Sequence, residues 1–190
     1  CSSKKLNTFI DFKKMPLAGA FLNKNQIKKE YKYPMAMQFC EDCSNVQVDT
    51  VIPLDVLFKK YFYFSSNIKT LINHFGDLAK LVETKFLKNK SSTVLEIGCN
   101  DGVFLNQLSN YNNIKCVGVD PAKNVVKKIK NKKITIYNNG FDYGLAKKIK
   151  KKINNVDLIV SSFSFGHIDQ MNSVTKGIDL LLKKNGTFIF

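Results

Sequence analysis

The stretch VLEIGCNDG, residues 94–102, reads as a buried strand that turns sharply into a helix. Gly98 and Gly102 would let the backbone turn and approach a ligand closely. The next apolar run, CVGVD at residues 116–120, ends in Asp120. A carboxylate at the tip of the neighbouring parallel strand can accept hydrogen bonds from both ribose hydroxyls. The two signals together predict a Rossmann-like nucleoside site, with an ordinary strand-to-helix turn that binds nothing as the alternative.

The glycine pattern selects the type of cofactor. A dinucleotide-binding turn would carry Gly-x-Gly-x-x-Gly, whereas this turn has Asn100 at the middle position and Glu96 inside the strand. The pattern resembles the acid-x-Gly-x-Gly-x-Gly motif of class I S-adenosylmethionine-dependent methyltransferases, with asparagine replacing the middle glycine. This resemblance implies that S-adenosylmethionine is the cofactor. It also implies that the cofactor is lined by Glu96, Gly98, Asn100, Gly102 and Asp120.

Composition limits the classes of protein. The 190 residues are 44% hydrophobic, which suffices for a real core. The net charge of +15 would ordinarily suggest a nucleic-acid partner, but all 30 basic residues are lysine and none is arginine. Arginine is the side chain whose planar fork suits phosphate and guanine, so the composition argues against nucleic acid. With neither a membrane-spanning run nor a signal peptide, a protein without membrane contact, located in the cytoplasm, is expected.

Strands and helices are predicted to alternate after residue 90, which is typical of a parallel sheet with crossover helices. The expected strands are 93–97, 114–119, 133–137, 156–161 and 187–190, and the expected helices are 102–110, 122–131, 143–152 and 170–183. We therefore expect an α/β fold with three parts: an N-terminal module at 1–66, a connecting helix at 67–90 and a cofactor domain at 91–190. Because the last strand stops without a cap or turn, the chain is expected to be truncated there.

The cysteines suggest a metal site in the N-terminal module. Cys40 and Cys43 are spaced Cys-x-x-Cys, so their thiolates could coordinate one zinc ion, and Cys1 offers a third ligand. A redox pair would be expected at the start of a helix in a thioredoxin-like unit, and no such pattern surrounds residue 40. Structural zinc, redox thiols and inert thiols are the three interpretations.

Motifs along nearly the whole chain together resemble the sugar C-methyltransferase family. They are CSSKKL at 1–6, MPLA at 15–18, YP at 33–34, CEDC at 40–43, VQ at 46–47, YFYFSS at 61–66, the turn at 94–102 and GVDPA at 118–122. The resemblance implies a zinc-binding module joined to a methyltransferase domain, with Cys1, Cys40 and Cys43 as three of four zinc ligands and the fourth cysteine upstream of Cys1. It also implies a nucleotide-activated keto-deoxysugar as substrate. In such enzymes a base removes the proton next to the ketone, and the resulting carbanion takes the methyl group.

The same resemblance suggests further site residues. His167 follows the fourth strand at the position of a family Asn-x-x-x-His motif whose asparagine is here replaced by Phe163. Tyr63 matches a family tyrosine that reaches the active site. Without that asparagine, Ser161, Ser162 or backbone carbonyls are candidates for contact with the amino-acid part of the cofactor. Phe141 is a candidate for contact with its adenine because it follows the third strand.

The family's principal base is expected beyond residue 190, so this fragment is expected to be inactive alone. Two rival interpretations are a zinc-ribbon nucleic-acid module with a Rossmann-like appendage, and a protein that binds S-adenosylmethionine without turnover. The sequence indicates neither the oligomeric state nor which sugar carbon is methylated.

Overall fold

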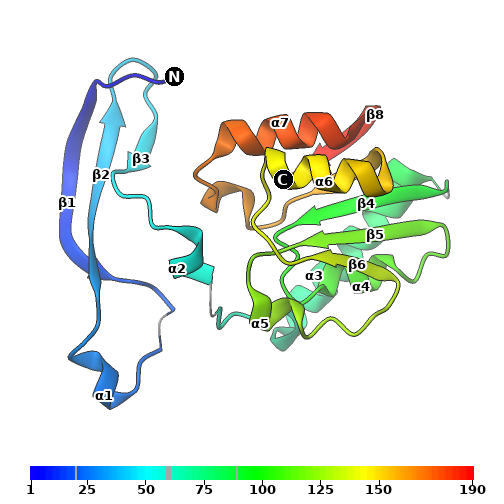
Figure 1. Cartoon of the computed structure of the whole chain (residues 1–190), viewed down its shortest axis with the longest axis horizontal. Coiled ribbons are helices and arrows are strands. Elements are labelled where there is room, and N and C mark those ends of the chain that lie inside the picture. Colours follow the sequence, from blue (N-terminus) through cyan, green and yellow to red (C-terminus); the bar gives the residue numbers. More distant parts are fainter. Residues whose placement is uncertain (20, 59–60, 89) are drawn as a thin grey trace. The chain divides into compact units, whose positions relative to one another are not determined.

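The chain divides into two compact units, Cys1–Leu57 and Phe58–Phe190 (Figure 1). The computed structural model describes residues 1–19, 21–58, 61–88 and 90–190. The second unit takes in residues 61–66, which were assigned to the N-terminal module, and most of the predicted connecting helix. Residue 89, near the end of that predicted helix, lies outside the described residues.

The first unit is built on a three-stranded antiparallel sheet in the order β1-β2-β3. Its elements are β1 (Leu6–Pro16), α1 (Lys24–Ile27), β2 (Lys32–Cys40), β3 (Val46–Val48) and α2 (Leu54–Phe58), whose last residue belongs to the second unit. Leu6 at the start of β1 pairs with Cys40 at the end of β2. This register brings the N-terminus to the turn between β2 and β3.

The second unit contains a five-stranded sheet in the order β6-β5-β4-β7-β8, with every neighbouring pair parallel. Its strands are β4 (Ser92–Ile97), β5 (Ile114–Val119), β6 (Ile134–Tyr137), β7 (Val156–Val160) and β8 (Leu182–Ile189). Its helices are α3 (Lys69–Leu81), α4 (Val103–Leu108), α5 (Lys123–Val126), α6 (Tyr143–Ile153) and α7 (Met171–Leu181). The strand order reverses next to β4, and ligands of such sheets bind at the carboxyl edge of this switch point.

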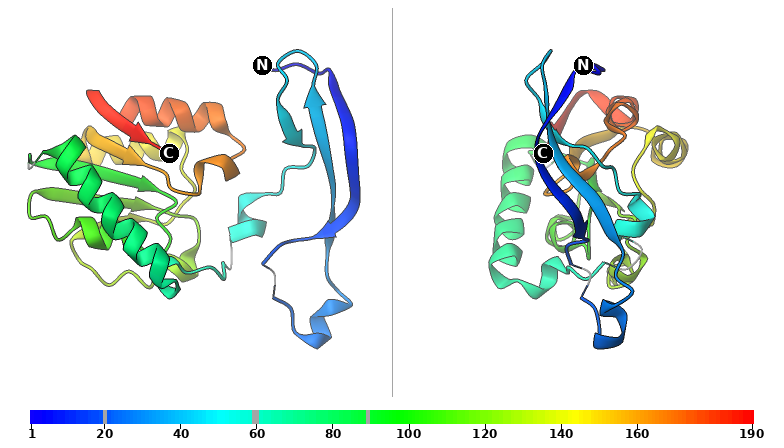
Figure 2. Two further views of the ribbon diagram at one scale, coloured as in Figure 1. Left: turned by 180° about the vertical axis from the view of Figure 1, so that it is seen from behind. Right: turned by 90° about the vertical axis from the view of Figure 1, so that its left-hand side faces the viewer.

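Helices cover both faces of the parallel sheet. Side chains alternate along β4, so Val94 packs into one core cluster with α3 and α4, while Leu95 and Ile97 pack into a second with α6 and α7. The reverse view in Figure 2 shows α3 crossing the face opposite α7. The predicted α/β fold with a parallel sheet and a small N-terminal module is thus confirmed.

Three elements differ from the predictions. The connecting helix expected at 67–90 passes into a π-helix, η2 (Val82–Leu87). The extra residue in the π-turn rotates the following side chains, so Leu87 is buried while Phe86 is 43% exposed.

The helix expected at 122–131 ends at Val126, where a lysine-rich run begins whose like charges disfavour a longer helix. The last helix ends at Leu181, and β8 begins at Leu182 with a register shift that includes Asn185 and Gly186. Among the helices in the described ranges, none is long and apolar enough to cross a membrane.

Candidate functional site

The turn after β4 has the left-handed backbone that its glycines allow. Gly98, Asn100 and Gly102 have positive φ angles of 77°, 49° and 78°. The N–H groups of Gly98 and Cys99 both donate to the carbonyl of Val119, at 2.8 and 3.1 Å, and so tie the turn to the end of β5. A Cβ atom at Gly98 would collide with the side chain of Ser164. Only glycine therefore fits at position 98, both for its conformation and for the space around it.

Asp120 lies directly beside this turn. Its Oδ2 accepts a hydrogen bond from the Asn100 N–H at 2.9 Å, and its Oδ1 accepts one from the Ala122 N–H at 2.8 Å. Burial raises the pKa of this carboxyl, while these two N–H groups act in the opposite direction. Two neighbouring strands thus bring Gly98, Asn100 and Asp120 together at one edge of the sheet.

Three buried carboxyl groups form what we call the acid cluster: Glu96, Asp101 and Asp120, which are 3%, 6% and 7% exposed. Burial, followed by the charges of Asp120 and Asp101, raises the pKa of Glu96 well above its ordinary value. Within the described residues, Oε2 of Glu96 and Oδ1 of Asp101 have no hydrogen-bond partner. Because buried polar atoms are normally paired, these two oxygens fit a ligand that brings positive charge or hydrogen-bond donors.

Tyr63 meets the turn through its backbone, because its carbonyl accepts a hydrogen bond from Nδ2 of Asn100 at 3.1 Å. Its side chain is 45% exposed. His167 lies in the short turn η3 (Phe165–His167) after β7, with an exposed side chain and with its N–H bonded to the carbonyl of Ser164 at 3.0 Å. Ser162 is partly buried in the same connection.

Phe141 occupies a different environment. It is 6% exposed and belongs to the apolar cluster with α6 and α7. A Cβ atom at Gly177 of α7 would lie 3.1 Å from its ring, so Phe141 packs closely against that helix. The structure therefore gives Phe141 a core position.

Three site residues were missed by the sequence reasoning. Asp101 completes the acid cluster, and its place in the predicted cofactor turn, between Asn100 and Gly102, could have indicated a role in the site. Ser164 covers Gly98, with its Oγ donating to the Ile97 carbonyl at 2.7 Å. Asn124 binds the backbone of Tyr61. No local pattern marks these contacts, because Ile97 lies more than 60 residues from Ser164 and Tyr61 more than 60 residues from Asn124.

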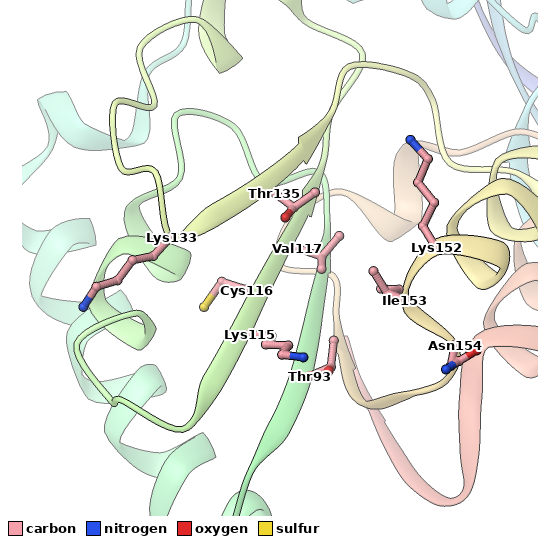
Figure 3. Close-up of a pocket in the computed structure, with 9 residues that line it drawn as sticks. All are labelled: Thr93, Lys115, Cys116, Val117, Lys133, Thr135, Lys152, Ile153 and Asn154. Carbon is pink, nitrogen blue, oxygen red and sulfur yellow. The ribbon is translucent and has the colours of Figure 1, made fainter.

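A pocket of about 290 Å³ lies at the opposite edge of the sheet, where the strands begin (Figure 3). Its lining includes Thr93, Lys115, Lys133 and Lys152. The three lysine side chains point in different directions, and Lys152 lies over the ring of Tyr137. Because these ammonium groups do not converge, the pocket does not form an anion site.

The predicted metal ligands come together in the first unit. The Sγ atoms of Cys1, Cys40 and Cys43 all lie within 4.8 Å of one another, and those of Cys1 and Cys40 are 3.6 Å apart. Thiolates about 2.3 Å from a tetrahedral zinc ion would be about 3.8 Å apart, so three corners of such a site are present. A hydrogen bond from the Cys43 backbone lowers the pKa of the Cys40 thiol, which favours the thiolate. The pair lies in a β-hairpin turn, not at the helix start that a thioredoxin-like motif requires.

Comparisons with known proteins bear on both units. Residues 1–58 match a family described as "Putative zinc binding domain", and residues 71–190 match one described as "Methyltransferase domain". The chain is 28% identical over 180 residues to the C-methyltransferase NovU of Streptomyces niveus. That alignment covers 94% of this chain and 43% of the relative, so the chain spans less than half of the relative's length.

Solved structures resemble the chain in fold. An S-adenosyl-L-methionine-dependent methyltransferase of Methanococcus maripaludis, itself described as putative, aligns with a TM-score of 0.50 and 18% identity, over 68% of this chain and 64% of that chain. The plantazolicin methyltransferase BpumL, solved with a triazolic desmethylPZN analogue and SAH, aligns with a TM-score of 0.51 and 17% identity, over 66% of this chain and 49% of that chain. These findings confirm the predicted combination of a zinc-binding module with a Rossmann-like methyltransferase domain.

Proposed function

Because the chain belongs to the methyltransferase domain family, we propose that it holds S-adenosylmethionine at the carboxyl edge of its parallel sheet. The observation that carries this proposal is the acid cluster beside the glycine turn. Glu96 and Asp101 each leave one buried carboxylate oxygen without a partner among the described residues. A ligand with an ammonium group, a sulfonium and two ribose hydroxyls matches the charge and the hydrogen-bonding needs of such a site.

Each residue has a distinct role in this proposal. Asp120 would accept hydrogen bonds from the ribose hydroxyls, as acids at this position of Rossmann-like sites do. Glu96 would balance the positive charge of the amino-acid part. Gly98 and Gly102 would allow the backbone to approach the ligand. When bound, S-adenosylmethionine supplies an electrophilic methyl group next to a good leaving group.

The acceptor is proposed to be a carbon atom next to the ketone of a nucleotide-activated deoxysugar. Two supports are the resemblance of the sequence motifs to the sugar C-methyltransferase family and the 28% identity to a C-methyltransferase along 94% of the chain. A base would remove the proton from that carbon, and S-adenosylmethionine would supply the methyl group that the resulting enolate takes up. His167 and Tyr63 are proposed to contact the reacting sugar.

Isothermal titration calorimetry with S-adenosylhomocysteine tests the cofactor site. We expect saturable binding by the wild-type chain. Asp120→Ala should weaken it by about 10- to 100-fold, because it removes hydrogen bonds to a charged group that contribute about 1.5–3 kcal/mol. Asp179→Asn, which removes an exposed carboxylate from α7, is the matched control and should leave the affinity unchanged. Absence of binding by the wild-type chain, or equal affinity of Asp120→Ala, would contradict the proposed site.

A further inference from the structure

Two asparagine side chains hold the backbone of residues 61–66, which we call the tyrosine segment. Asn124 accepts from the N–H of Tyr61 at 3.1 Å and donates to its carbonyl at 2.6 Å. Asn100 accepts from the N–H of Ser65 at 3.0 Å and donates to the carbonyl of Tyr63 at 3.1 Å. Each amide thus pairs with one backbone donor and one backbone acceptor, as a neighbouring β-strand would.

Asp101 adds a third attachment. Its Oδ2 accepts from the Ser66 hydroxyl at 2.6 Å and from the Ser66 N–H at 3.3 Å. The N–H of Asp101 also donates to Oδ1 of Asn100 at 2.9 Å, which holds the asparagine side chain in place. The attachments therefore come from the turn after β4 and from α5 after β5, the two elements that flank Asp120.

The amide explains why asparagine stands where related turns have glycine. Position 100 has a φ of 49°, which glycine would adopt without strain and which asparagine tolerates better than most residues. A glycine there would serve the turn equally well but could not reach the tyrosine segment. The side chain of Asn100 is therefore accounted for by the attachment and not by the turn.

The attachments bring two phenol rings close to the cofactor site. Asn124, which holds Tyr61, lies two residues after Ala122, whose N–H donates to Asp120. Burial and the charge of Asp120 raise the pKa of Tyr61. The ring centroids of Tyr61 and Tyr63 are 6.3 Å apart, and that of Phe58 is 5.3 Å from Tyr61. The tyrosine segment thus presents an aromatic surface beside Asp120.

We infer that Asn100 and Asn124 are positioning residues that preorganise the tyrosine segment as a wall of the nucleoside site. Binding of the methyl donor and ordering of this segment are then coupled, and the coupling acts equally in both directions. A ligand between the turn and Asp120 would further protect the amides of the tyrosine segment from hydrogen exchange. If the segment were detached, ligand binding would have to order it, and the affinity would fall. The inference rests on the proposed function, because it requires the donor to bind at this edge.

Asn100→Gly is the decisive variant, because glycine suits the backbone at position 100 and removes only the amide. Hydrogen–deuterium exchange is followed by mass spectrometry in peptides covering residues 61–66, with and without S-adenosylhomocysteine. Without ligand, these amides should exchange about tenfold faster in Asn100→Gly than in the wild type. Affinity for S-adenosylhomocysteine, measured by calorimetry, should fall about 3- to 10-fold, as expected for the loss of one or two net hydrogen bonds.

Asn124→Ala should release the other end of the segment and weaken the ligand in the same direction. The matched control is Asn155→Ala, since Asn155 also donates to backbone carbonyls, those of Leu181 and Leu182, but lies just before β7 at the opposite edge. It should change neither exchange in residues 61–66 nor ligand affinity. Circular dichroism checks that each variant is folded.

The outcomes separate the two levels of the proposal. Unchanged exchange in Asn100→Gly overturns the attachment. Faster exchange with unchanged ligand affinity overturns the coupling, as does a wild-type segment that the ligand does not protect. Absence of binding by the wild-type chain overturns the proposed function and the coupling with it, while the ligand-free exchange still decides the attachment.

Discussion

Replacing Glu96 with glutamine should stabilise the second unit at neutral pH. Glu96 is 3% exposed inside β4, and its Oε2 has no hydrogen-bond partner within the described ranges. Burial, then the charges of Asp120 and Asp101, raises the pKa of this carboxyl well above its usual value. Glutamine keeps the shape of the side chain and cannot ionise. We therefore expect the free energy of unfolding at neutral pH to rise by about 1–3 kcal/mol, because burial opposes the ionisation of the wild-type carboxyl and glutamine carries no such penalty.

The gain should depend on pH in one direction. A carboxyl whose pKa is higher in the folded chain keeps its proton there while the unfolded chain releases its own. The wild type therefore loses stability as the pH rises from about 4.3, the ordinary value for glutamate, through the raised pKa of the folded state. Below about pH 4 both proteins carry a neutral side chain at this position, so the difference between them should vanish.

Urea unfolding followed by circular dichroism measures this difference. The three longest helices, α3, α6 and α7, all lie in the second unit, so the helical signal reports on that unit. Asp179→Asn removes an exposed carboxylate and should change stability by no more than about 0.5 kcal/mol. A glutamine variant less stable than the wild type at neutral pH, or equally stabilised at pH 4, would refute the reasoning. The same variant should bind S-adenosylhomocysteine more weakly, because Glu96 could ionise to balance the ammonium group of the ligand and glutamine could not.

Two further predictions concern the metal cluster and the core. Cys43→Ser removes one of three clustered thiolates, so zinc measured by plasma mass spectrometry should be lost on dialysis, whereas Cys116→Ala, in β5, should retain it. Zinc retained by Cys43→Ser would remove Cys43 from the ligand set. Leu105→Ala should lower the free energy of unfolding by about 2–5 kcal/mol, because Leu105 of α4 is fully buried. A loss below about 1 kcal/mol would show that the cavity collapses.

The alternation of strands and helices was predictable because it depends on local periodicity. Every predicted strand has a counterpart in the parallel sheet, and β5 has the predicted bounds, 114–119. The π-turn at residues 82–87 was not predictable, because a helical pattern assumes a constant number of residues per turn. The π-turn buries Glu83 and Leu87 and leaves Phe86 43% exposed.

The site was predictable only where its signals are close together in sequence. The glycine turn and Asp120 form one such local pattern. The Cys-x-x-Cys spacing of Cys40 and Cys43 is another. Ser164 binds Ile97 and Asn124 binds Tyr61, each more than 60 residues away, and such contacts follow from the order of the strands. Phe141 is buried in the apolar cluster with α6 and α7, and its contact with adenine stays a prediction.

Asn100 shows why a departure from a motif can carry more information than the motif. In the sequence, its place between two glycines distinguished only one class of cofactor from another. In the structure, its amide pairs with backbone atoms 35 and 37 residues away, while its own N–H binds Asp120. The turn therefore joins the acid cluster to the tyrosine segment through one residue. Since two carboxylate oxygens of that cluster remain without partners among the described residues, the site is held in a costly arrangement whose stabilisation we expect from the bound donor.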